Sequence, residues 1–451
     1  MKRNEFVKNA SIATAAFAIH PGIPIFSKPA AANVKLGIIG VGQRGRGHLN
    51  NLLQRADVDI VAISDVDGRS INLANELIAK KGKAMPQTFL GDEGNWKKMI
   101  ENTKLDGIII ATPWEWHKPM IIGSLEAGIK YVASEVIIGI TIEDHWEVVR
   151  AAEKYQAQVM MLENVCYRRD VMAVLNMVRQ GIFGEIIHLQ GGYQHDLRDV
   201  KFNDGQHIHG HGVEFGPKGL SEARWRTEHA VHRNGDLYPT HGIGPIANCI
   251  NINRGNRFQS ICSFSSKTRG LHNYIVKLGG ENHPNAKVNF KLGDVVTTSI
   301  RCVNGQTILL QHDTNLPRPY SLGFRVQGTE GLWMDINNSV YLEDKSAKVH
   351  QWDDAKDWLE KYDHPLWKRW SKESVDAGHG GMDFFVLHAF IESIKKKTPT
   401  PMDVYDAASW SAITALSEQS IELGNQTIDF PDFTNGQWMY RKPVFCLNDD
   451  Y

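Results

Sequence analysis

Two titratable side chains, Tyr238 and His241, lie three residues apart in the run Asn234-Gly-Asp-Leu-Tyr-Pro-Thr-His-Gly-Ile-Gly-Pro245. If a helix begins at His241, with Pro239 in its first turn and Thr240 as its cap, this spacing places both side chains on one face. Tyrosine and histidine act as acid–base partners when burial or a neighbouring cation adjusts their pKa values. The alternative is an ordinary aromatic residue beside a hydrogen-bonded histidine at a domain interface. We expect both side chains to project into a pocket.

A second set of polar side chains lies around residues 191–226. Tyr193 and His195 alternate in Gly191-Gly-Tyr-Gln-His-Asp-Leu-Arg198, so they share a face if this segment is a strand. Arg226 and Tyr320 offer guanidinium and phenol groups that suit sugar hydroxyls or an acetamido group. Glu163 ends a predicted strand just before the chain leaves the first domain, and it is a candidate helper in acid–base chemistry.

A phosphate-binding turn is indicated near the N-terminus. Gly40-x-Gly42-x-x-Gly45 follows an apolar run and precedes a helical pattern. Glycine permits the tight turn and lets the backbone approach a pyrophosphate, which binds the amides at the helix N-terminus. Asp65 ends the next apolar run, about 20 residues further on, where a carboxylate binds both ribose hydroxyls and repels a 2′-phosphate. The pattern predicts NAD rather than NADP, with a purely structural glycine turn as the alternative.

Strands and helices alternate over the first third of the chain. We predict strands at 34–40, 58–64, 106–111, 130–134 and 157–161, with helices near 45–55, 68–80, 117–128 and 142–155. This alternation is typical of an α/β Rossmann domain with a doubly wound parallel sheet, which binds ligands at the carboxyl ends of its strands. The run Ala111-Thr-Pro-Trp-Glu-Trp-His117 lies at that edge. Trp114 and Trp116 therefore either stack on a nicotinamide or cap the core.

The pattern changes after about residue 165. We predict a helix over 167–180, strands that include 293–303, 307–312 and 323–328, and helices over 382–396 and 402–423. This predicts a C-terminal α+β domain with an open, mainly antiparallel sheet. We place an export leader at 1–32, the NAD-binding domain at 33–165 and a substrate domain at 166–451. The last helices of the substrate domain are free to pack back on the first domain.

The composition excludes several classes of protein. The 451 residues are 42% hydrophobic and 22% charged, as is ordinary for a soluble globular protein. A net charge of −1 gives no reason to expect nucleic acid or an anionic membrane as a partner. The five scattered cysteines, without CxxC spacing, argue against a disulfide framework and a zinc site. His207-x-His209-x-His211 has no carboxylates at suitable spacing, so we expect a solvated loop and no metal.

The N-terminus has the pattern of an export signal. Lys2 and Arg3 give a basic start, residues 10–19 are apolar, and Ala30-Ala31-Ala32 offers a cleavage site. The Lys-Arg pair resembles a twin-arginine signal with lysine in place of one arginine. A disordered tail is the alternative. No apolar run reaches the roughly 20 residues of a membrane span, and we expect a periplasmic protein.

Glu135 and Val136 follow the predicted strand 130–134. Together with the glycine turn, Asp65, the Ala-Thr-Pro-x-x-x-His run ending at His117 and the two-domain order, they resemble the Gfo/Idh/MocA oxidoreductases. Those dehydrogenases commonly read Glu-Lys-Pro at this position, where the lysine assists proton transfer from a substrate hydroxyl. This chain lacks that lysine, which argues against a simple alcohol dehydrogenase that depends on it.

The motifs Trp-Glu-Trp-His, Glu-Val, Leu-Glu-Asn and the long run that ends at Pro245 resemble glycoside hydrolase family 109. These are NAD-dependent α-N-acetylgalactosaminidases within the same superfamily. The resemblance implies NAD contacts at Gln43, Arg44, Asp65, Trp114, Glu115, Trp116, His117, Glu135, Val136 and Asn164. It implies sugar contacts at Tyr193, Arg226, Tyr238, Pro239, Thr240, His241 and Tyr320. The loop 200–220 matches least.

The resemblance also implies a mechanism, because NAD-dependent hydrolysis is an exception to the usual two-carboxylate glycosidases. Retained NAD would oxidise carbon 3 of the sugar, and the ketone would acidify the proton on carbon 2. The aglycone would leave by elimination, water would add at carbon 1, and the ketone would be reduced again. We expect Tyr238 and His241 to handle the 3-hydroxyl proton, and Tyr193 or His195 to serve at carbon 2 or the leaving group.

Two other functions stay open at this point. One is a sugar or polyol dehydrogenase that releases NADH, and the other is a sugar-binding protein that retains NAD structurally. A glycan or glycoconjugate is the expected partner of the hydrolase. An exposed face of the second sheet would suit a homo-oligomer.

Overall fold

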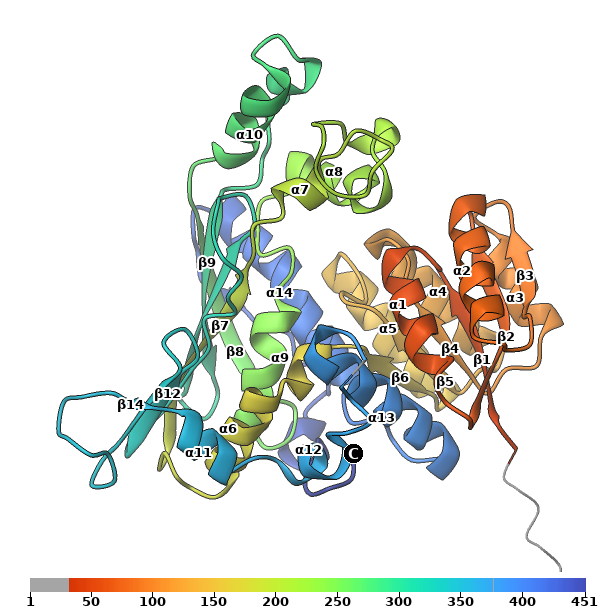
Figure 1. The fold of residues 1–451 in the computed structure, drawn as a ribbon. Helices are drawn as coiled ribbons and strands as arrows, with labels where there is room; N and C mark the ends of the chain where they lie inside the picture. Colours follow the sequence, from red (N-terminus) through yellow and green to blue (C-terminus); the bar gives the residue numbers. More distant parts are fainter. Residues whose placement is uncertain (1–31, 376) are drawn as a thin grey trace, which may run out of the picture. The chain divides into compact units, whose positions relative to one another are not determined.

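The computed structural model describes residues 32–375 and 377–451, drawn in Figure 1. Residues 33–451 form one compact unit. The predicted export leader, residues 1–32, lies outside the described residues except for Ala32. Within the described ranges, no helix has the length and apolar character that crossing a bilayer requires.

The N-terminal sheet is parallel, with strand order β3-β2-β1-β4-β5-β6. Its strands are β1 (Val34–Ile39), β2 (Val58–Asp65), β3 (Gln87–Leu90), β4 (Gly107–Ile110), β5 (Tyr131–Ser134) and β6 (Gln158–Met161). Its helices are α1 (Gln43–Leu52), α2 (Gly68–Lys80), α3 (Asn95–Asn102), α4 (Trp114–Glu126) and α5 (Ile142–Tyr155). The strand order reverses between β1 and β4, which is where doubly wound sheets bind their ligands. The predicted Rossmann fold is confirmed.

Strand β3 and helix α3 were not predicted. Gln87, Thr88 and Leu90 are exposed on the edge strand β3, so no apolar run marks it. Helix α3 does carry a helical spacing of buried residues, with Trp96 and Met99 three apart. That signal was present in the sequence and the prediction overlooked it.

The second sheet is mixed, with order β14-β13-β12-β11-β7-β10-β9-β8-β15. Its strands are β7 (Ile186–Gln194), β8 (Phe258–Ser265), β9 (Val295–Cys302), β10 (Thr307–Asp313), β11 (Arg325–Gly328), β12 (Gly331–Met334), β13 (Ser339–Leu342), β14 (Asp353–Asp354) and β15 (Ile428–Asp429). Only the β7–β10 pair is parallel among the pairs of this sheet. The prediction of a mainly antiparallel sheet is confirmed.

The helices of the second half are α6 (Arg169–Arg179), α7 (Arg198–Lys201), α8 (Arg226–His232), α9 (Thr240–Cys249), α10 (Gly270–Gly279), α11 (Lys356–Lys361), α12 (Pro365–Trp370), α13 (Met382–Lys396) and α14 (Val404–Glu422). Short 3₁₀ turns include η1 (Asn164–Tyr167) and η3 (Ser221–Arg224). Helix α13 spans the predicted 382–396 and contacts α1 and β1, while α14 contacts α5 and β6. The last two helices therefore lie against elements of the Rossmann sheet.

Helix α9 lies unusually close to strand β7 because both carry glycine at the contact. A Cβ atom at Gly242 would lie 2.4 Å from the backbone nitrogen of Gly192, and one at Gly191 would lie 2.4 Å from the carbonyl oxygen of Gly242. Any side chain at these positions would push the helix off the sheet. The close approach places His241, at the start of α9, beside Tyr193 near the end of β7.

Candidate active site

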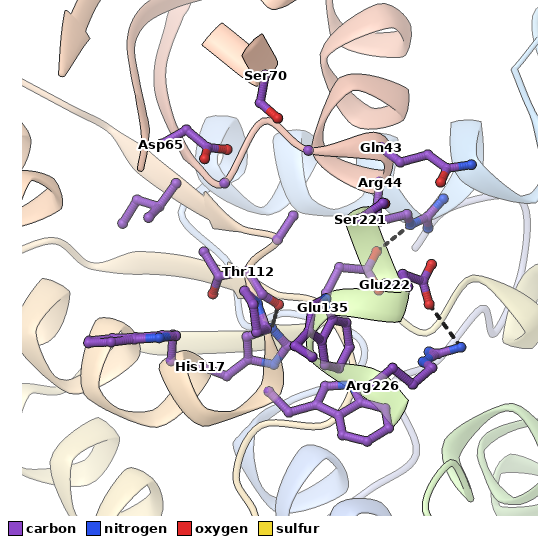
Figure 2. Close-up of a pocket in the computed structure, with 18 of the residues that line it drawn as sticks. Gln43, Arg44, Asp65, Ser70, Thr112, His117, Glu135, Ser221, Glu222 and Arg226 are labelled. Carbon is purple, nitrogen blue, oxygen red and sulfur yellow. Dashed lines mark hydrogen bonds and ion pairs between the residues drawn. The ribbon is translucent and has the colours of Figure 1, made fainter. Parts of the chain in front are cut away.

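A cleft of about 430 Å³ extends from the turn after β1 to residues of α8 and α9, and Figure 2 shows part of its lining. Most of the predicted site residues line it. They are Gly40, Gly42, Gln43, Arg44, Asp65, Trp114, Trp116, His117, Glu135, Val136, Asn164, Tyr193, Arg226, Tyr238 and His241. The fold therefore brings the predicted cofactor and sugar residues to one continuous surface.

The turn after β1 fits a pyrophosphate. Gly40 has φ +85°, and a Cβ atom on it would lie 2.5 Å from the carbonyl oxygen of Ala111. A Cβ atom on Gly45 would lie 1.9 Å from the carbonyl oxygen of Gly40, whereas one on Gly42 would meet nothing within 4 Å. The turn is thus packed tightly at Gly40 and Gly45 and open at Gly42. No side chain caps the first amides of α1. Free amides facing an open cradle suit an anion.

Asp65 is oriented by the same turn. Its Oδ2 accepts a hydrogen bond from the backbone nitrogen of Val41 at 2.7 Å, and its Oδ1 accepts one from Asp67 at 2.9 Å. Burial raises the pKa of Asp65, while these backbone donors oppose the rise. The carboxylate lies at the end of β2, where it can accept from ribose hydroxyls and repel a 2′-phosphate. This geometry fits NAD.

Three predicted cofactor residues belong to one buried ion-pair network. Arg44 places Nε 2.6 Å from Glu135 and Nη1 2.8 Å from Asp383. His48 Nε2 lies 2.7 Å from the same Glu135 oxygen, and Asn164 donates to Asp383 at 2.7 Å. Burial alone would lower the pKa of Arg44, but the two carboxylates outweigh it and raise that pKa. The network joins α1, the end of β5 and α13 beneath the cleft.

Not every predicted cofactor residue faces the cleft with a free polar group. The carboxylate of Glu115 lies 2.9 Å from His229 Nε2 and does not line the cleft. His117 lines the cleft, but its Nδ1 lies 2.5 Å from the carbonyl oxygen of Ile137 and its Nε2 lies 2.8 Å from that of Thr112 (Figure 2). Burial lowers the pKa of His117. Its ring therefore braces two loops of the cleft wall.

Trp114 is buried, as the core-capping alternative predicts, and it also lines the cleft. Its ring centroid lies 5.0 Å from that of Trp225 and 4.8 Å from that of His229. The Arg226 guanidinium lies 5.3 Å from the Trp114 ring centre. Trp114 thus connects the start of α4 with the segment around α8. Trp116 is only partly buried and lines the cleft as well.

His241 is paired with a fully buried carboxylate. Its Nδ1 lies 2.8 Å from Glu163 Oε1 and 2.9 Å from Oε2. Glu163 also accepts from the backbone nitrogen of Val165 at 3.1 Å, which fixes the carboxylate at the start of η1. The pairing assigns the Nδ1 proton to the Glu163 side and leaves Nε2 as the acceptor in the partly exposed ring. This is the arrangement of a general base supported by a carboxylate.

Two tyrosines enclose His241. The ring centroids of Tyr238 and Tyr193 lie 4.8 and 5.3 Å from that of His241, and 4.6 Å from each other. The Tyr193 hydroxyl lies 3.3 Å from His195 Nδ1, as expected for two residues on one face. Burial raises the pKa of Tyr193 to about 12, while the positive charge of Arg226 opposes the rise. Burial raises the pKa of Tyr238 as well.

One detail of the predicted motif is wrong. Helix α9 begins at Thr240, and Pro239 occupies the capping position. Thr240 is therefore inside the helix, and its hydroxyl has no hydrogen-bond partner among the described residues. Neither Pro239 nor Thr240 lines the cleft. Tyr238 and His241 still lie next to each other and both line the cleft, because Tyr238 lies just before the helix and His241 lies in its first turn.

Arg226 lines the cleft at the start of α8 and is held there by Glu222, whose Oε2 lies 3.0 Å from its Nη1 (Figure 2). Its guanidinium also lies 5.0 Å from the ring centre of Tyr238. Tyr320 does not line the cleft, and half of its surface is exposed. Its ring centroid lies 4.9 Å from that of His195, so it lies next to the Tyr193–His195 pair.

Comparison with known families decides what this cleft belongs to. The family profile described as glycosyl hydrolase 109, C-terminal domain, matches residues 167–440. The profile described as oxidoreductase family, NAD-binding Rossmann fold, matches residues 34–163. The chain belongs to glycosyl hydrolase family 109. It is an NAD-dependent glycoside hydrolase, and residues 34–163 are its NAD-binding domain.

Individual relatives agree with this family 109 assignment. The chain is 55% identical to a glycosyl hydrolase family 109 protein of Stenotrophomonas maltophilia, over 100% of this chain and 99% of the relative. It is 53% identical to a protein of Tannerella forsythia named alpha-N-acetylgalactosaminidase, over 93% and 91%. A levoglucosan dehydrogenase in complex with NADH superposes with a TM-score of 0.62 at 19% identity, covering 89% of this chain and 100% of that one. That likeness shows the shared fold.

The structure adds residues to the family 109 cleft that the sequence prediction missed. Asp383 anchors Arg44 from 339 residues away, so no local pattern could reveal it. Glu222 stands four residues before Arg226, a helical ion-pair spacing that the sequence did show. His379 lines the cleft within Gly378-His-Gly-Gly381, where all four residues have positive φ, and its Nδ1 lies 2.8 Å from Asp383.

The histidine run in the loop 200–220 is exposed, as the solvated-loop interpretation predicts. His207 Nδ1 lies 2.7 Å from Asp204, and His209 Nε2 lies 3.3 Å from the side-chain nitrogen of Gln43. The loop therefore reaches the dinucleotide turn. In the part of the chain that the structure describes, no group of three or more His, Cys, Asp or Glu residues could hold a metal ion.

Proposed function

We propose that this family 109 enzyme releases terminal α-linked N-acetylgalactosamine from a glycan or glycoconjugate while its NAD stays bound. The name of the Tannerella forsythia relative supports the sugar and the anomer. The observation that carries the proposal is His241, which is paired with the buried Glu163 and lines the same cleft as the dinucleotide turn. A base at this place suits removal of a proton from a sugar hydroxyl.

When bound, NAD would supply a reversible hydride acceptor for the sugar ring and would not be consumed over a turnover. The glycine turn from Gly40 to Gly45 would hold its pyrophosphate, and Asp65 would hold a ribose. The network around Arg44 shapes the floor of the cleft, because its charged groups are already satisfied by one another.

His241 is the residue that takes the proton of the 3-hydroxyl. Its Nε2 faces the cleft as an acceptor, and the Glu163 carboxylate stabilises the imidazolium that forms. Tyr238 packs edge-on against this ring and orients the same hydroxyl. Val136 is buried and apolar at the position where dehydrogenases of the superfamily commonly have lysine, so His241 replaces that group as the base.

Tyr193 handles the proton on carbon 2. Its ring lies within 4.6 Å of Tyr238 and 5.3 Å of His241, measured between centroids, so one sugar ring can contact all three. The neighbouring Arg226 favours negative charge on the Tyr193 oxygen. Arg226 also offers donors to the acetamido oxygen, with Glu222 fixing its orientation.

The test is incubation of the purified enzyme with nitrophenyl N-acetyl-α-galactosaminide and its epimers and anomers, without added NAD. We expect nitrophenol to be released and no reduced cofactor to accumulate. Accumulation of NADH in proportion to a consumed free sugar would instead identify a dehydrogenase. Sugar binding without any turnover would identify a binding protein.

We also propose that the enzyme is exported to the periplasm and associates with itself. Lys2, Arg3, the apolar residues 10–19 and Ala30–Ala32 support export. Self-association would use the outer face of the second sheet, where Ser299 and Arg301 of β9 are exposed. N-terminal sequencing of the protein from a periplasmic fraction, and its mass in solution by light scattering, test these two proposals. An intact Met1 or a monomer would contradict the respective proposal.

A further inference from the structure

A second, smaller cavity of about 20 Å³ adjoins the end of the cleft where Tyr193, Arg226 and Tyr238 lie. Trp114, Tyr193, Arg226 and Tyr238 line both spaces, so these four side chains form the partition between them. The far side of the cavity is lined by Leu197, Lys201, Ala230, Leu237, Leu292, His312 and Thr314. Most of the lining is apolar, but Lys201 and His312 are polar groups of its wall, and a space of this size can hold one water molecule between such partners.

Lys201 is one of three polar residues of this cavity that the proposed mechanism leaves unused, with His312 and Thr314. It ends α7 and is buried. Its Nζ donates to Thr314 Oγ1 at 2.7 Å and to Asn315 Oδ1 at 2.5 Å, and Thr314 O lies further away, at 3.5 Å. Two short hydrogen bonds satisfy a neutral amine, whereas an ammonium needs a third acceptor, which a cavity water can supply. The site therefore accommodates both protonation states.

No carboxylate forms an ion pair with Lys201 among the described residues. The nearest acidic and basic groups are Asp196, Arg226, Asp294, His312 and Asp313. Each of the three aspartates has another partner. Asp196 pairs with Arg198 at 2.7 Å, and Asp313 pairs with Arg318 at 2.6 Å. Asp294 accepts a hydrogen bond from the backbone nitrogen of Arg269 at 2.7 Å. Burial, assisted by the charge of Arg226, lowers the pKa of Lys201 to about 7.

His312 connects Lys201 with Tyr193. Strands β10 and β7 pair in parallel with His312 opposite Tyr193, so the two side chains lie next to each other on one face of the sheet. His312 is buried, and its Nδ1 has no hydrogen-bond partner among the described residues. A buried ring nitrogen without a partner is costly, and a water in the cavity would satisfy it.

We propose that Lys201 is a positioning residue that stores a proton for Tyr193 through one water in this cavity. The inference rests on the proposed role of Tyr193 at carbon 2. When the carbon 2–hydrogen bond breaks, the proton joins the Tyr193 oxygen while the original hydroxyl proton passes through the water to Lys201 Nζ. The electron pair left on carbon 2 forms the double bond to carbon 1, and the bond to the aglycone oxygen breaks with its pair on that oxygen. Reversal of the relay returns the proton to carbon 2.

The first test compares pH profiles of kcat/KM for the wild type, Lys201→Met and Lys201→Gln. The store must be a neutral amine before the proton moves, so the wild type should lose activity as the pH falls through about 7. We expect both variants to lack this loss of activity near pH 7. Their kcat should fall by about 10²-fold, with KM and bound NAD little changed. Lys201→Gln keeps hydrogen-bond donors for Thr314 and Asn315, so it is the variant to measure if Lys201→Met does not fold. Profiles that superimpose on the wild type would overturn the proposal.

Two further variants separate a relay from a structural effect. In a Tyr193→Phe background, Lys201→Met should cause no additional loss, because Lys201 acts only through Tyr193. Full additive loss in the double variant would contradict the relay. Ile300→Val removes one buried methylene from β9 about four residues along the strand from the cavity, and it should lower stability without moving the pH profile.

An activity-independent measurement distinguishes this inference from the proposed function. In protein labelled with carbon-13 at lysine Cε, one resonance should titrate near pH 7 and be missing from Lys201→Gln. If every lysine titrates in its ordinary range, the proposed role of Lys201 is wrong, whichever substrate the enzyme hydrolyses. If the resonance is present but no glycoside is cleaved, the proposed function fails while Lys201 keeps its near-neutral ionisation.

Discussion

His241 Nδ1 lies 2.8 Å from the buried carboxylate of Glu163, although 78 residues separate the two in the sequence. Glu163 follows the last strand of the Rossmann sheet, and His241 begins the helix that packs on the second sheet. Glycine at position 244 of the same helix allows their close approach, because a Cβ atom there would lie 3.1 Å from Glu163 Cγ. One hydrogen bond thereby joins the two halves of the chain at the point where a sugar would meet the cofactor.

Glu163→Gln tests the role of this pair. A glutamine carbonyl can still accept from Nδ1, so the ring should stay in place, but the negative charge that stabilises the imidazolium is lost. We expect kcat to fall by about 10²-fold, with KM and bound NAD unchanged. His241→Ala should lose more activity and also keep its NAD. Full activity in His241→Ala would remove this residue from the mechanism.

Asp383→Asn tests the network beneath the cofactor. It leaves Arg44 with one carboxylate instead of two, and we expect a loss of about 1–3 kcal/mol in the free energy of unfolding. The charge of Arg44 and the hydrogen bond from His379 hold the pKa of Asp383 below its ordinary value despite burial. The stability from Asp383 is therefore present above about pH 4 and is lost as the pH falls through the lowered folded-state pKa. Denaturant unfolding at several pH values measures it, and a deficit that grows in acid would contradict the account.

Asp236→Asn tests a carboxyl group whose contribution to stability should depend on pH in the opposite direction. Burial raises the pKa of Asp236 to about 7, and the backbone donor of Tyr238 opposes the rise. Because the folded-state pKa lies above the unfolded one, the stability linked to Asp236 is fully present below about pH 4 and declines until about pH 7. Asparagine avoids this decline and keeps an oxygen for the Tyr238 amide. The variant should therefore gain stability relative to wild type between these pH values; a constant difference would refute the prediction.

Asp65→Ala tests the choice of cofactor. Removing the carboxylate deletes the predicted ribose contact and the charge that repels a 2′-phosphate. We expect weaker retention of NAD and a smaller preference for NAD over NADP, measured by calorimetry on protein freed of its cofactor. Asp59→Ala, an exposed change on the same strand, is the matched control. An unchanged preference for NAD over NADP in Asp65→Ala would mean that another group recognises the ribose.

The Rossmann half was predictable because its signals are local. The glycine turn, Asp65 and the helices at 68–80 and 142–155 each follow from residues within one element. Strand β3 escaped because an exposed edge strand needs no apolar run. The cap was placed one residue too late, because the helix already begins at Thr240 and Pro239 occupies the capping position.

The contacts that make the site depend on long-range packing. Arg44 and Glu135 were predicted to touch the cofactor, but no local pattern indicates that Asp383, 339 residues away, pairs with Arg44. The register that sets His312 beside Tyr193 depends on a parallel pairing between strands more than 100 residues apart. Residue types indicated the chemistry, and only the fold shows which groups meet.

The most direct test of the central claim is an isotope effect on turnover without added NAD. Two nitrophenyl N-acetyl-α-galactosaminides are compared with the unlabelled substrate, one with deuterium on carbon 2 and one with deuterium on carbon 3. We predict that at least one label slows nitrophenol release by a primary isotope effect, because both carbon–hydrogen bonds break during each turnover. Equal rates for all three substrates would contradict redox-activated elimination and indicate direct displacement at carbon 1.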